Sequence, residues 1–274
     1  KASLLKDLSH LDEKKIVKNF YHKSFSQLLK LNDYGFKESK SKIQSFKLNR
    51  EIVINYAEQR NFPNLNSTSK IGPYLRFGTV SIRKIVSGLL SFKDDTFLKE
   101  LVWREFFMQI LYHFPHTAND SFKQKYDKIV WLNDDASFES WKNGATGYPL
   151  IDAGMHELNK TGFMHNRVRM ITASFLCKHL LIDWRWGEKY FALKLNDYEM
   201  ASNVGNWQWA SGSGVDAAPY FRIFNPHTQI HKFDKKREYI SKWINENSED
   251  YPDEIIDHKY ARQRCLNTYK KYLD

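Results

Sequence analysis

The chain has 274 residues, of which 42% are hydrophobic and 15% aromatic, enough apolar side chains for a sizeable core. Its formal net charge of +10 favours an anionic partner, with nucleic acid the first candidate, although charge alone also fits a basic surface with no partner. Cys177 and Cys265 are far apart and form no CxxC pair, which argues against a disulfide framework and a cysteine-based metal site. No apolar run reaches the length of a membrane-spanning helix.

The N-terminal part of the chain is predicted to be a linker followed by a helix. Residues 1–37 are rich in Lys, Ser and Asp, and we interpret them as a linker or the edge of an upstream domain. Residues 38–274 form the predicted globular unit. Its first helix is predicted over residues 38–60, and Pro63 ends the helical pattern.

A possible anion site follows this helix. Thr68 and Ser69 are good capping residues, and Gly72-Pro73 marks a turn into the next helix. Exposed amide groups at such a helix start bind phosphate well, although simple capping explains the same residues.

Residues 96–114 are predicted to form a helix with one unusual face. Glu100, Trp103, Arg104 and Phe107 share that face by their spacing, which combines a carboxylate, a guanidinium and two aromatic rings. The face is either a half-exposed surface with an ion pair, or a wall that stacks on a nucleobase and hydrogen-bonds its edge. The spacing leaves both interpretations open.

Residues 115–150 are predicted to be irregular, and a short helix over 152–159 is predicted to end at Gly162. The next helix is predicted to run from His165 to about residue 181, with Arg169 on the same face as Ala173. A buried Arg169 would need a carboxylate partner, for which Asp197 and Glu199 are candidates, whereas a surface arginine would not.

The C-terminal third combines a predicted loop with a helical tail. Gly and Ser residues around Trp207 and Trp209 predict a loop or turn, and the basic tail from Lys232 is predicted to be helical. Strand signals are nearly absent, so the fold is predicted to be all-α and irregular, with long connecting loops. No internal repeat, zinc-ligand spacing or P-loop is present, and no metal site is predicted.

Seven stretches resemble, in order, the FAD-binding helical domain of the DNA photolyase/cryptochrome family. They are YAEQRNFP, TSKIGPYLRFG, ELVWREFF, GYPLIDAGM, GFMHNRVRMITASFL, DWRWGEKYF and NWQWASGSGVDAAPYFRIFNP. The resemblance covers residues 56–229 and implies an all-α, multi-helix FAD-binding domain. Family members also carry an upstream α/β antenna domain, which is expected to be absent from this chain.

The resemblance implies FAD bound in a U-shaped conformation. Its phosphates and neighbouring groups would be held by Tyr56, Thr68, Ser69, Lys70, Ile71 and Gly72. Asp197, Tyr198 and Glu199 match the segment beside the ribityl chain and the isoalloxazine ring, although the family usually has Asp at the position of Glu199. Arg169 matches the arginine that pairs with Asp197. Asn203 matches the residue opposite flavin N5, where an amide cannot protonate the flavin and so favours the reduced anion.

The resemblance also implies electron-transfer and lesion-binding residues. Trp131, Trp184 and Trp207 match the tryptophan chain that relays electrons to an oxidised flavin, although from the residues alone they would be core side chains. Together with Glu100 and Asn203 they form the predicted catalytic set. The predicted contacts to the lesion and its flanking DNA are Arg60, Glu100, Trp103, Arg104, Phe107, Asn166, Arg167, Met170 and Gln229.

The function that the resemblance implies is light-driven repair of cyclobutane pyrimidine dimers in UV-damaged DNA. Asn166 and Arg167 follow His165, where a (6-4) enzyme would show a paired histidine, so a class I enzyme of the microbial type is expected. The alternatives are a cryptochrome-type photoreceptor without repair activity and a DNA-binding module that has lost FAD. We expect a cytoplasmic monomer with no membrane partner, and we expect this chain not to bind the folate or deazaflavin antenna chromophore.

Overall fold

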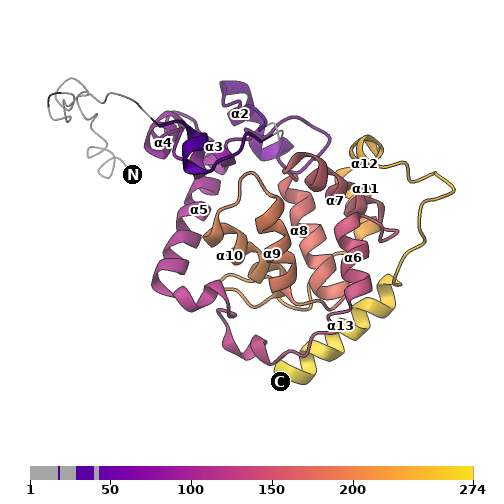
Figure 1. The fold of residues 1–274 in the computed structure, drawn as a ribbon. Helices are drawn as coiled ribbons and strands as arrows, with labels where there is room; N and C mark the ends of the chain where they lie inside the picture. The colour runs from indigo at the N-terminus through magenta and orange to yellow at the C-terminus, as the bar shows by residue number, and fades with distance from the viewer. Residues whose placement is uncertain (1–17, 19–28, 40–42, 274) are drawn as a thin grey trace.

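The computed structural model describes residue 18 and residues 29–39 and 43–273, and these residues are helical with no strand (Figure 1). The predicted all-α fold is therefore confirmed. The linker predicted over residues 1–37 lies largely outside the described residues, apart from the short turn η2 (Leu31–Tyr34). Within the described part of the chain, no helix combines the length and the apolar character needed to cross a membrane.

A small apolar cluster joins the first helices to the beginning of a long one. Figure 1 shows these elements grouped at one end of α5. They are α2 (Arg50–Gln59), α3 (Gly72–Arg76), α4 (Ile82–Leu89) and α5 (Thr96–His113). Their shared core contains Val53, Ile71, Leu75, Leu89, Phe97 and Leu101.

Two sequence predictions about this region are wrong at the helix starts. The helix predicted over residues 38–60 begins only at Arg50, where the Asn49 side chain accepts a hydrogen bond from the Ile52 amide at 2.9 Å. Thr68 and Ser69 do not cap α3, because the residue before its first turn is Ile71 and no side chain caps it. The helix predicted over residues 96–114 is confirmed as α5.

The main core lies among the central helices of Figure 1. After the short turns η3 (Pro115–Ala118) and η4 (Gln124–Lys128), it is built from α6 (Asp135–Asn143), α7 (Pro149–Thr161), α8 (Asn166–Ser174), η5 (Phe175–His179), α9 (Trp184–Lys194) and α10 (Met200–Ser211). Residues 115–150 are therefore less irregular than predicted, because α6 lies within them. The helix predicted from His165 is confirmed as α8, and it continues as one turn of π-helix in η5.

The loop or turn predicted around Trp207 and Trp209 is wrong for these two residues, which lie in α10, and it is confirmed only for the following residues Gly212 to Gly214. Glu199 caps the start of this helix, and Gly212, with φ 100°, ends it. The small residues inside α10 serve close packing instead. A Cβ on Gly205 would lie 2.2 Å from the Phe107 ring of α5, so only glycine allows the two helices to approach this closely.

The helical tail is confirmed and packs against the central helices. The tail beyond Lys232 contains α12 (Glu238–Trp243) and α13 (His258–Leu273), and α11 (Pro226–Phe233) precedes them. The Tyr239 hydroxyl of α12 donates to Glu157 of α7 at 2.6 Å. Nε2 of His179 in η5 lies 2.8 Å from Nδ1 of His258 in α13, and burial lowers the pKa of His179 to about 3, which keeps its ring neutral.

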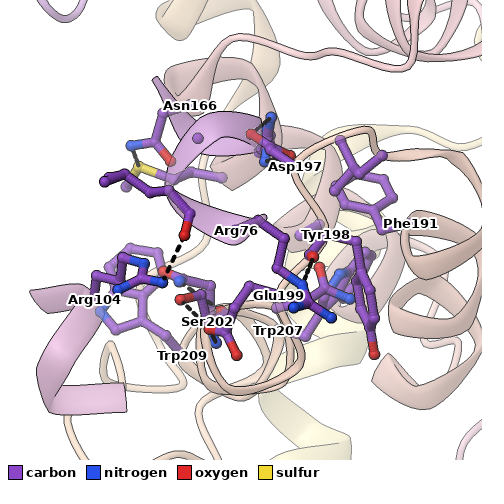
Figure 2. A pocket seen from close by; sticks show the side chains of 18 residues that line it. Arg76, Arg104, Asn166, Phe191, Asp197, Tyr198, Glu199, Ser202, Trp207 and Trp209 are labelled. Atoms are coloured by element: carbon purple, nitrogen blue, oxygen red, sulfur yellow. Dashed lines mark hydrogen bonds and ion pairs between the residues drawn. The ribbon is translucent and has the colours of Figure 1, made fainter. Parts of the chain in front are cut away.

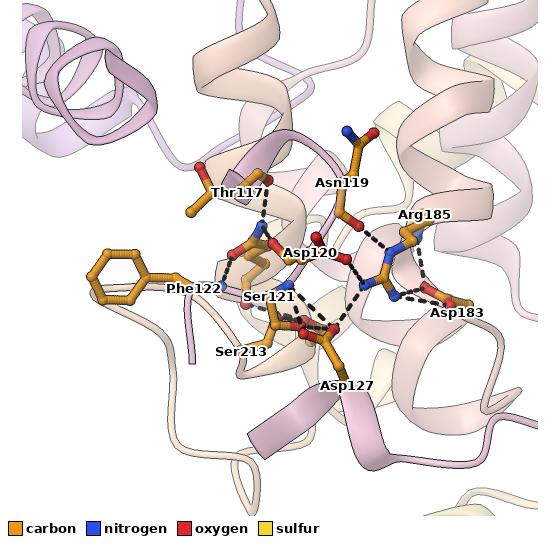
Figure 3. A network of polar contacts seen from close by, with 11 residues as sticks. Thr117, Asn119, Asp120, Ser121, Phe122, Asp127, Asp183, Arg185 and Ser213 are labelled. Carbon is orange, nitrogen blue, oxygen red and sulfur yellow. Dashed lines mark hydrogen bonds and ion pairs between the residues drawn. The ribbon is translucent and has the colours of Figure 1, made fainter. Parts of the chain in front are cut away.

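A polar network fixes α9 and α10 to the segment that follows α5 (Figure 3). The Arg185 guanidinium of α9 binds the carboxylates of Asp127 at 2.7 Å and Asp183 at 3.2 Å. The Gln208 amide of α10 donates to the carbonyls of Thr117 at 2.9 Å and Asp120 at 3.0 Å. Because buried polar groups are costly without partners, these bonds specify where the two helices lie.

Gly187 in α9 provides a test of this packing. A methyl group there would lie 2.1 Å from Cη2 of Trp207, so we expect Gly187→Ala to lower the free energy of unfolding by about 1–3 kcal/mol. Gly88→Ala in α4 is the control, since its methyl group would meet nothing within 4 Å and should stabilise the helix by up to about 1 kcal/mol. Urea unfolding followed by circular dichroism measures both, and equal stabilities would contradict the packing described for α9.

Candidate functional site

A cavity of about 940 Å³, part of it open to solvent, lies between α3, α8, α9 and α10 (Figure 2). Apolar walls come from Leu75, Phe191, Leu195 and the rings of Trp207 and Trp209. We call it the inner cavity.

A bidentate ion pair forms one side of the inner cavity. The Arg169 guanidinium donates to both carboxylate oxygens of Asp197, at 3.1 and 2.9 Å, and its Nε donates to the Met164 carbonyl at 2.7 Å. Asp197 is therefore the carboxylate partner of Arg169, one of the two candidates that the sequence predicted. Gly72 of α3 packs directly against the pair, since a Cβ there would lie 2.9 Å from Asp197.

Glu199 and Asn203 hold fixed positions at the start of α10. The Glu199 carboxylate accepts from the amides of Ala201 at 3.0 Å and Ser202 at 2.9 Å, and from the Ser202 hydroxyl at 2.8 Å. Its charge is therefore held by the helix start. Nδ2 of Asn203 donates to the carbonyl of Glu188 at 3.1 Å and to its carboxylate at 2.9 Å. The side-chain oxygen of Asn203 has no hydrogen-bond partner among the described residues, so it is available to a ligand of the inner cavity.

A second cavity of about 790 Å³, more open to solvent, borders the first. We call it the outer cavity. The predicted face of α5 lines it, and Arg60 forms an ion pair with Glu100. Trp103 remains 42% exposed there, with its ring 6.1 Å from that of Phe107. The two cavities share a wall made by Arg104, Asn166, Met170, Ser202, Asn206 and Trp209.

Most residues predicted to bind a lesion come together in the outer cavity. Seven line it, namely Arg60, Glu100, Trp103, Arg104, Phe107, Asn166 and Met170. In the described structure, Arg167 and Gln229 line neither cavity. Arg167 instead bonds to Asn61 and places its guanidinium 4.4 Å from the Phe233 ring centre.

The residues predicted to hold the FAD phosphates are more dispersed. Of Tyr56 and the five residues from Thr68 to Gly72, only Gly72 lines the inner cavity. Lys70 has a left-handed backbone, with φ 57°, and its ammonium lies 4.0 Å from the Phe163 ring centre. Burial and the charge of Glu100 raise the pKa of Tyr56 to about 12, so its hydroxyl stays protonated. The phosphate roles of these residues stay predictions.

The three tryptophans of the predicted relay lie in or against the main core. Trp184 and Trp207 are buried, and Trp131 is partly buried against the same cluster. Trp207 lines the inner cavity, and its ring centre is 6.1 Å from that of Trp141. Trp131 lies on the side of α13, with its ring centre 6.1 Å from that of Tyr269.

Arg76 and Glu188 are among the site residues that the sequence analysis did not identify. Arg76 reaches from α3 into the inner cavity and donates from Nε to the Tyr198 carbonyl at 2.9 Å. Glu188 orients the Asn203 amide from α9, and burial raises the pKa of its carboxyl. Local spacing carried no signal for Glu188, because its contact joins two different helices. Among the residues that the structure describes, no group of three His, Cys, Asp or Glu side chains forms a metal site.

Residues 97–249, more than half of the chain, match the family described as the FAD binding domain of DNA photolyase. The chain belongs to this family. A deoxyribodipyrimidine photo-lyase of Alkalihalophilus pseudofirmus is 39% identical over 282 residues, which cover 90% of this chain and 58% of that protein. The resemblance to the photolyase/cryptochrome family is thus confirmed.

Two solved structures extend the comparison. A bacterial class III photolyase from Agrobacterium tumefaciens matches this fold with a TM-score of 0.75 and 40% identity, over 81% of this chain and 53% of that one. A Synechocystis cryptochrome matches with a TM-score of 0.72 and 31% identity, over 79% of this chain and 52% of that one. The chain therefore spans little more than half the length of these relatives.

The contribution of the Arg169–Asp197 ion pair to stability can be tested by substitution. Asp197→Asn keeps the shape of the side chain but leaves the Arg169 charge without its counter-ion. Because both side chains are only partly buried, at 24% and 17% exposure, we expect a loss of about 1–3 kcal/mol in unfolding free energy. Urea unfolding of the FAD-free protein measures the loss.

The matched control for this variant is Glu139→Gln, which removes a carboxylate that is 59% exposed from its pair with Lys142. It should change stability by less than about 0.5 kcal/mol. Equal effects of the two substitutions would show that the Arg169 pair contributes no more than a surface ion pair.

Proposed function

We propose that this chain provides the FAD-binding and lesion-binding parts of a light-driven enzyme that repairs cyclobutane pyrimidine dimers in DNA. The observation that carries the proposal is the wall shared by the two cavities. An electron donor in the inner cavity and a lesion in the outer cavity would be neighbours. No side-chain nucleophile or metal is required for such a reaction.

FAD fits the chemistry of the inner cavity. The Arg169–Asp197 pair and the side-chain oxygen of Asn203 supply donors and acceptors, and the apolar walls suit a ring system. When bound, reduced FAD supplies the electron that blue light excites. The protein binds and orients the cofactor, and Asn203 offers no acidic proton at the position predicted to face flavin N5.

The outer cavity suits a flipped-out pyrimidine dimer. Photolyases are among the enzymes that extrude their target base from the duplex. The exposed Trp103 ring offers a stacking surface, and Asn166 and Glu100 can hydrogen-bond the imide and carbonyl groups of thymine. Arg60 and Arg104 supply positive charge for flanking phosphates.

The alternative function is that of a cryptochrome-type photoreceptor, and the similarity to the Synechocystis cryptochrome supports this alternative. The set of stacking and hydrogen-bonding groups in the outer cavity favours repair, because a photoreceptor needs no lesion site. A module without FAD is disfavoured by the intact pair between Arg169 and Asp197. The class I assignment, the unbound antenna chromophore, the monomeric state and the cytoplasmic location stay predictions.

The deciding experiment is repair of a thymine dimer in a short oligonucleotide by purified protein whose flavin has been reduced. Loss of the dimer in blue light, and not in the dark, is the expected result. A visible spectrum establishes that FAD is bound. Bound FAD without repair would refute the proposed reaction and favour the photoreceptor.

Trp103 tests the lesion site. We expect Trp103→Ala to weaken binding of dimer-containing DNA by about tenfold, because base stacking contributes roughly 1–3 kcal/mol, while FAD stays bound. The control is Tyr112→Ala, which removes an exposed aromatic ring from the same helix outside both cavities. Fluorescence anisotropy with a labelled oligonucleotide measures both affinities, and equal affinities would remove Trp103 from the lesion site.

Trp207 tests the proposed relay, in which Trp131, Trp184 and Trp207 carry an electron to oxidised flavin. We expect Trp207→Phe to abolish photoreduction of oxidised FAD but to spare repair by enzyme that was reduced beforehand. Trp141→Phe is the control, because Trp141 is equally buried and touches Trp207 without belonging to the relay. Normal photoreduction in Trp207→Phe would refute the relay.

A further inference from the structure

Arg76 is the feature of the inner cavity that the proposed function leaves unused. It is the last residue of α3, and Figure 2 shows its side chain reaching toward Tyr198. Its Nε donates to the Tyr198 carbonyl at 2.9 Å, which fixes the guanidinium. The two terminal nitrogens have no hydrogen-bond partner among the described residues and remain available to a ligand.

The charges around the inner cavity do not balance. Asp197 is paired with Arg169, and the Glu199 carboxylate is held by the start of α10. Across the described residues, no carboxylate lies within ion-pair distance of Arg76 or Arg104, both of which line the cavity. The lining carries three guanidinium groups, of Arg76, Arg104 and Arg169, against the two carboxylates of Asp197 and Glu199, a formal charge of +1 (3 − 2), so the site favours an anionic ligand.

The two arginines differ in the space that they face. Arg104 lines both cavities, so its charge is shared between a ligand of the inner cavity and one of the outer cavity. Arg76 lines only the inner cavity. Its charge should therefore act on the cofactor and not on DNA.

We propose that Arg76 binds the negative charge of FAD, either at the pyrophosphate or at the reduced isoalloxazine ring. The planar fork of a guanidinium suits phosphate oxygens, and a cation beside the ring stabilises the reduced flavin anion. This assignment rests on the proposed function and adds a cofactor contact to it. The bond from Arg76 to the Tyr198 carbonyl orients the guanidinium. It holds the guanidinium beside Asp197 and Glu199, which also line the inner cavity.

The test compares Arg76→Gln with Arg83→Gln, which removes the same charge from an exposed position of α4 outside both cavities. FAD is titrated into the FAD-free protein, and the midpoint potential of the bound flavin is measured. We expect Arg76→Gln to raise the Kd for FAD about tenfold or more, as for loss of a charged hydrogen bond, and Arg83→Gln to leave it unchanged. Affinity for dimer-containing DNA should be the same in both variants.

The Kd for FAD and the midpoint potential together distinguish a contact to the pyrophosphate from a contact to the isoalloxazine ring. A higher Kd with an unchanged potential places Arg76 at the pyrophosphate, and a lower potential places it at the ring. Arg76→Lys, which keeps the charge, should recover part of the affinity. A folded Arg76→Lys variant as weak as Arg76→Gln would assign the effect to the Tyr198 tether and overturn the proposal.

Two further outcomes separate this proposal from the proposed function. Equal Kd and potential in Arg76→Gln and Arg83→Gln, in a protein that binds FAD and repairs DNA, would overturn the role of Arg76 alone. A parent protein that binds no FAD would overturn the proposed function, and the role of Arg76 with it.

Discussion

The ion pair between Arg169 and Asp197 joins the parts of the chain on which the inner cavity depends. Arg169 belongs to α8, Asp197 lies just before α10, and Gly72 presses the start of α3 against the pair. A bidentate guanidinium–carboxylate contact fixes orientation as well as distance. Three segments that are far apart in sequence thus meet at one point. The positions of Arg76, Glu199 and Asn203 follow from that meeting, because each is within a few residues of it along its own segment.

The two cavities are neighbours because a single helix lines both. Ser202, Asn206 and Trp209 follow one another at helical spacing along α10, and all three face the shared wall. Asn203 and Trp207 each follow a residue of the shared wall by one position in the sequence, so they point in a different direction around α10. They line the inner cavity and not the outer one. The close approach of Gly205 to Phe107 holds this helix against α5, whose face supplies the outer cavity. The helical period of α10 therefore determines which residues face each cavity, and the absence of a side chain at Gly205 allows α10 to lie close to α5.

The sequence predicted those parts of the site that depend on local periodicity. The face of α5 with Glu100, Trp103 and Arg104 was evident from spacing, since every member lies on one helix. Asp197 and Glu199 were predicted as candidate partners of Arg169, because a buried guanidinium needs a carboxylate beside it. Motif resemblance then extended these local signals to a cofactor and a reaction that spacing alone does not specify.

Features that depend on tertiary contacts were not predictable in the same way. The Gly and Ser residues near Trp207 predicted a loop, yet α10 continues to Ser211 and the chain turns only from Gly212. Within the helix, Gly205 makes room for the Phe107 ring of α5. The amide of Asn203 is oriented by Glu188 from a different helix, and Arg76 is held by a carbonyl more than a hundred residues away. Such pairings carry no periodic signal, so they become visible only when the helices are assembled.

The burial of the tryptophans gives the proposed relay a direction. Nε1 of Trp184 is buried and has no acceptor among the described residues, whereas Trp131 is only partly buried. An oxidised indole is trapped when its N–H loses a proton to an acceptor or to water. Because no described residue can receive that proton from Trp184, positive charge that reached Trp184 in the proposed relay would pass on to another tryptophan. In the proposed relay, Trp131 is closer to solvent and would be the member from which the proton leaves, so the difference in burial would distinguish an intermediate tryptophan from the terminal one.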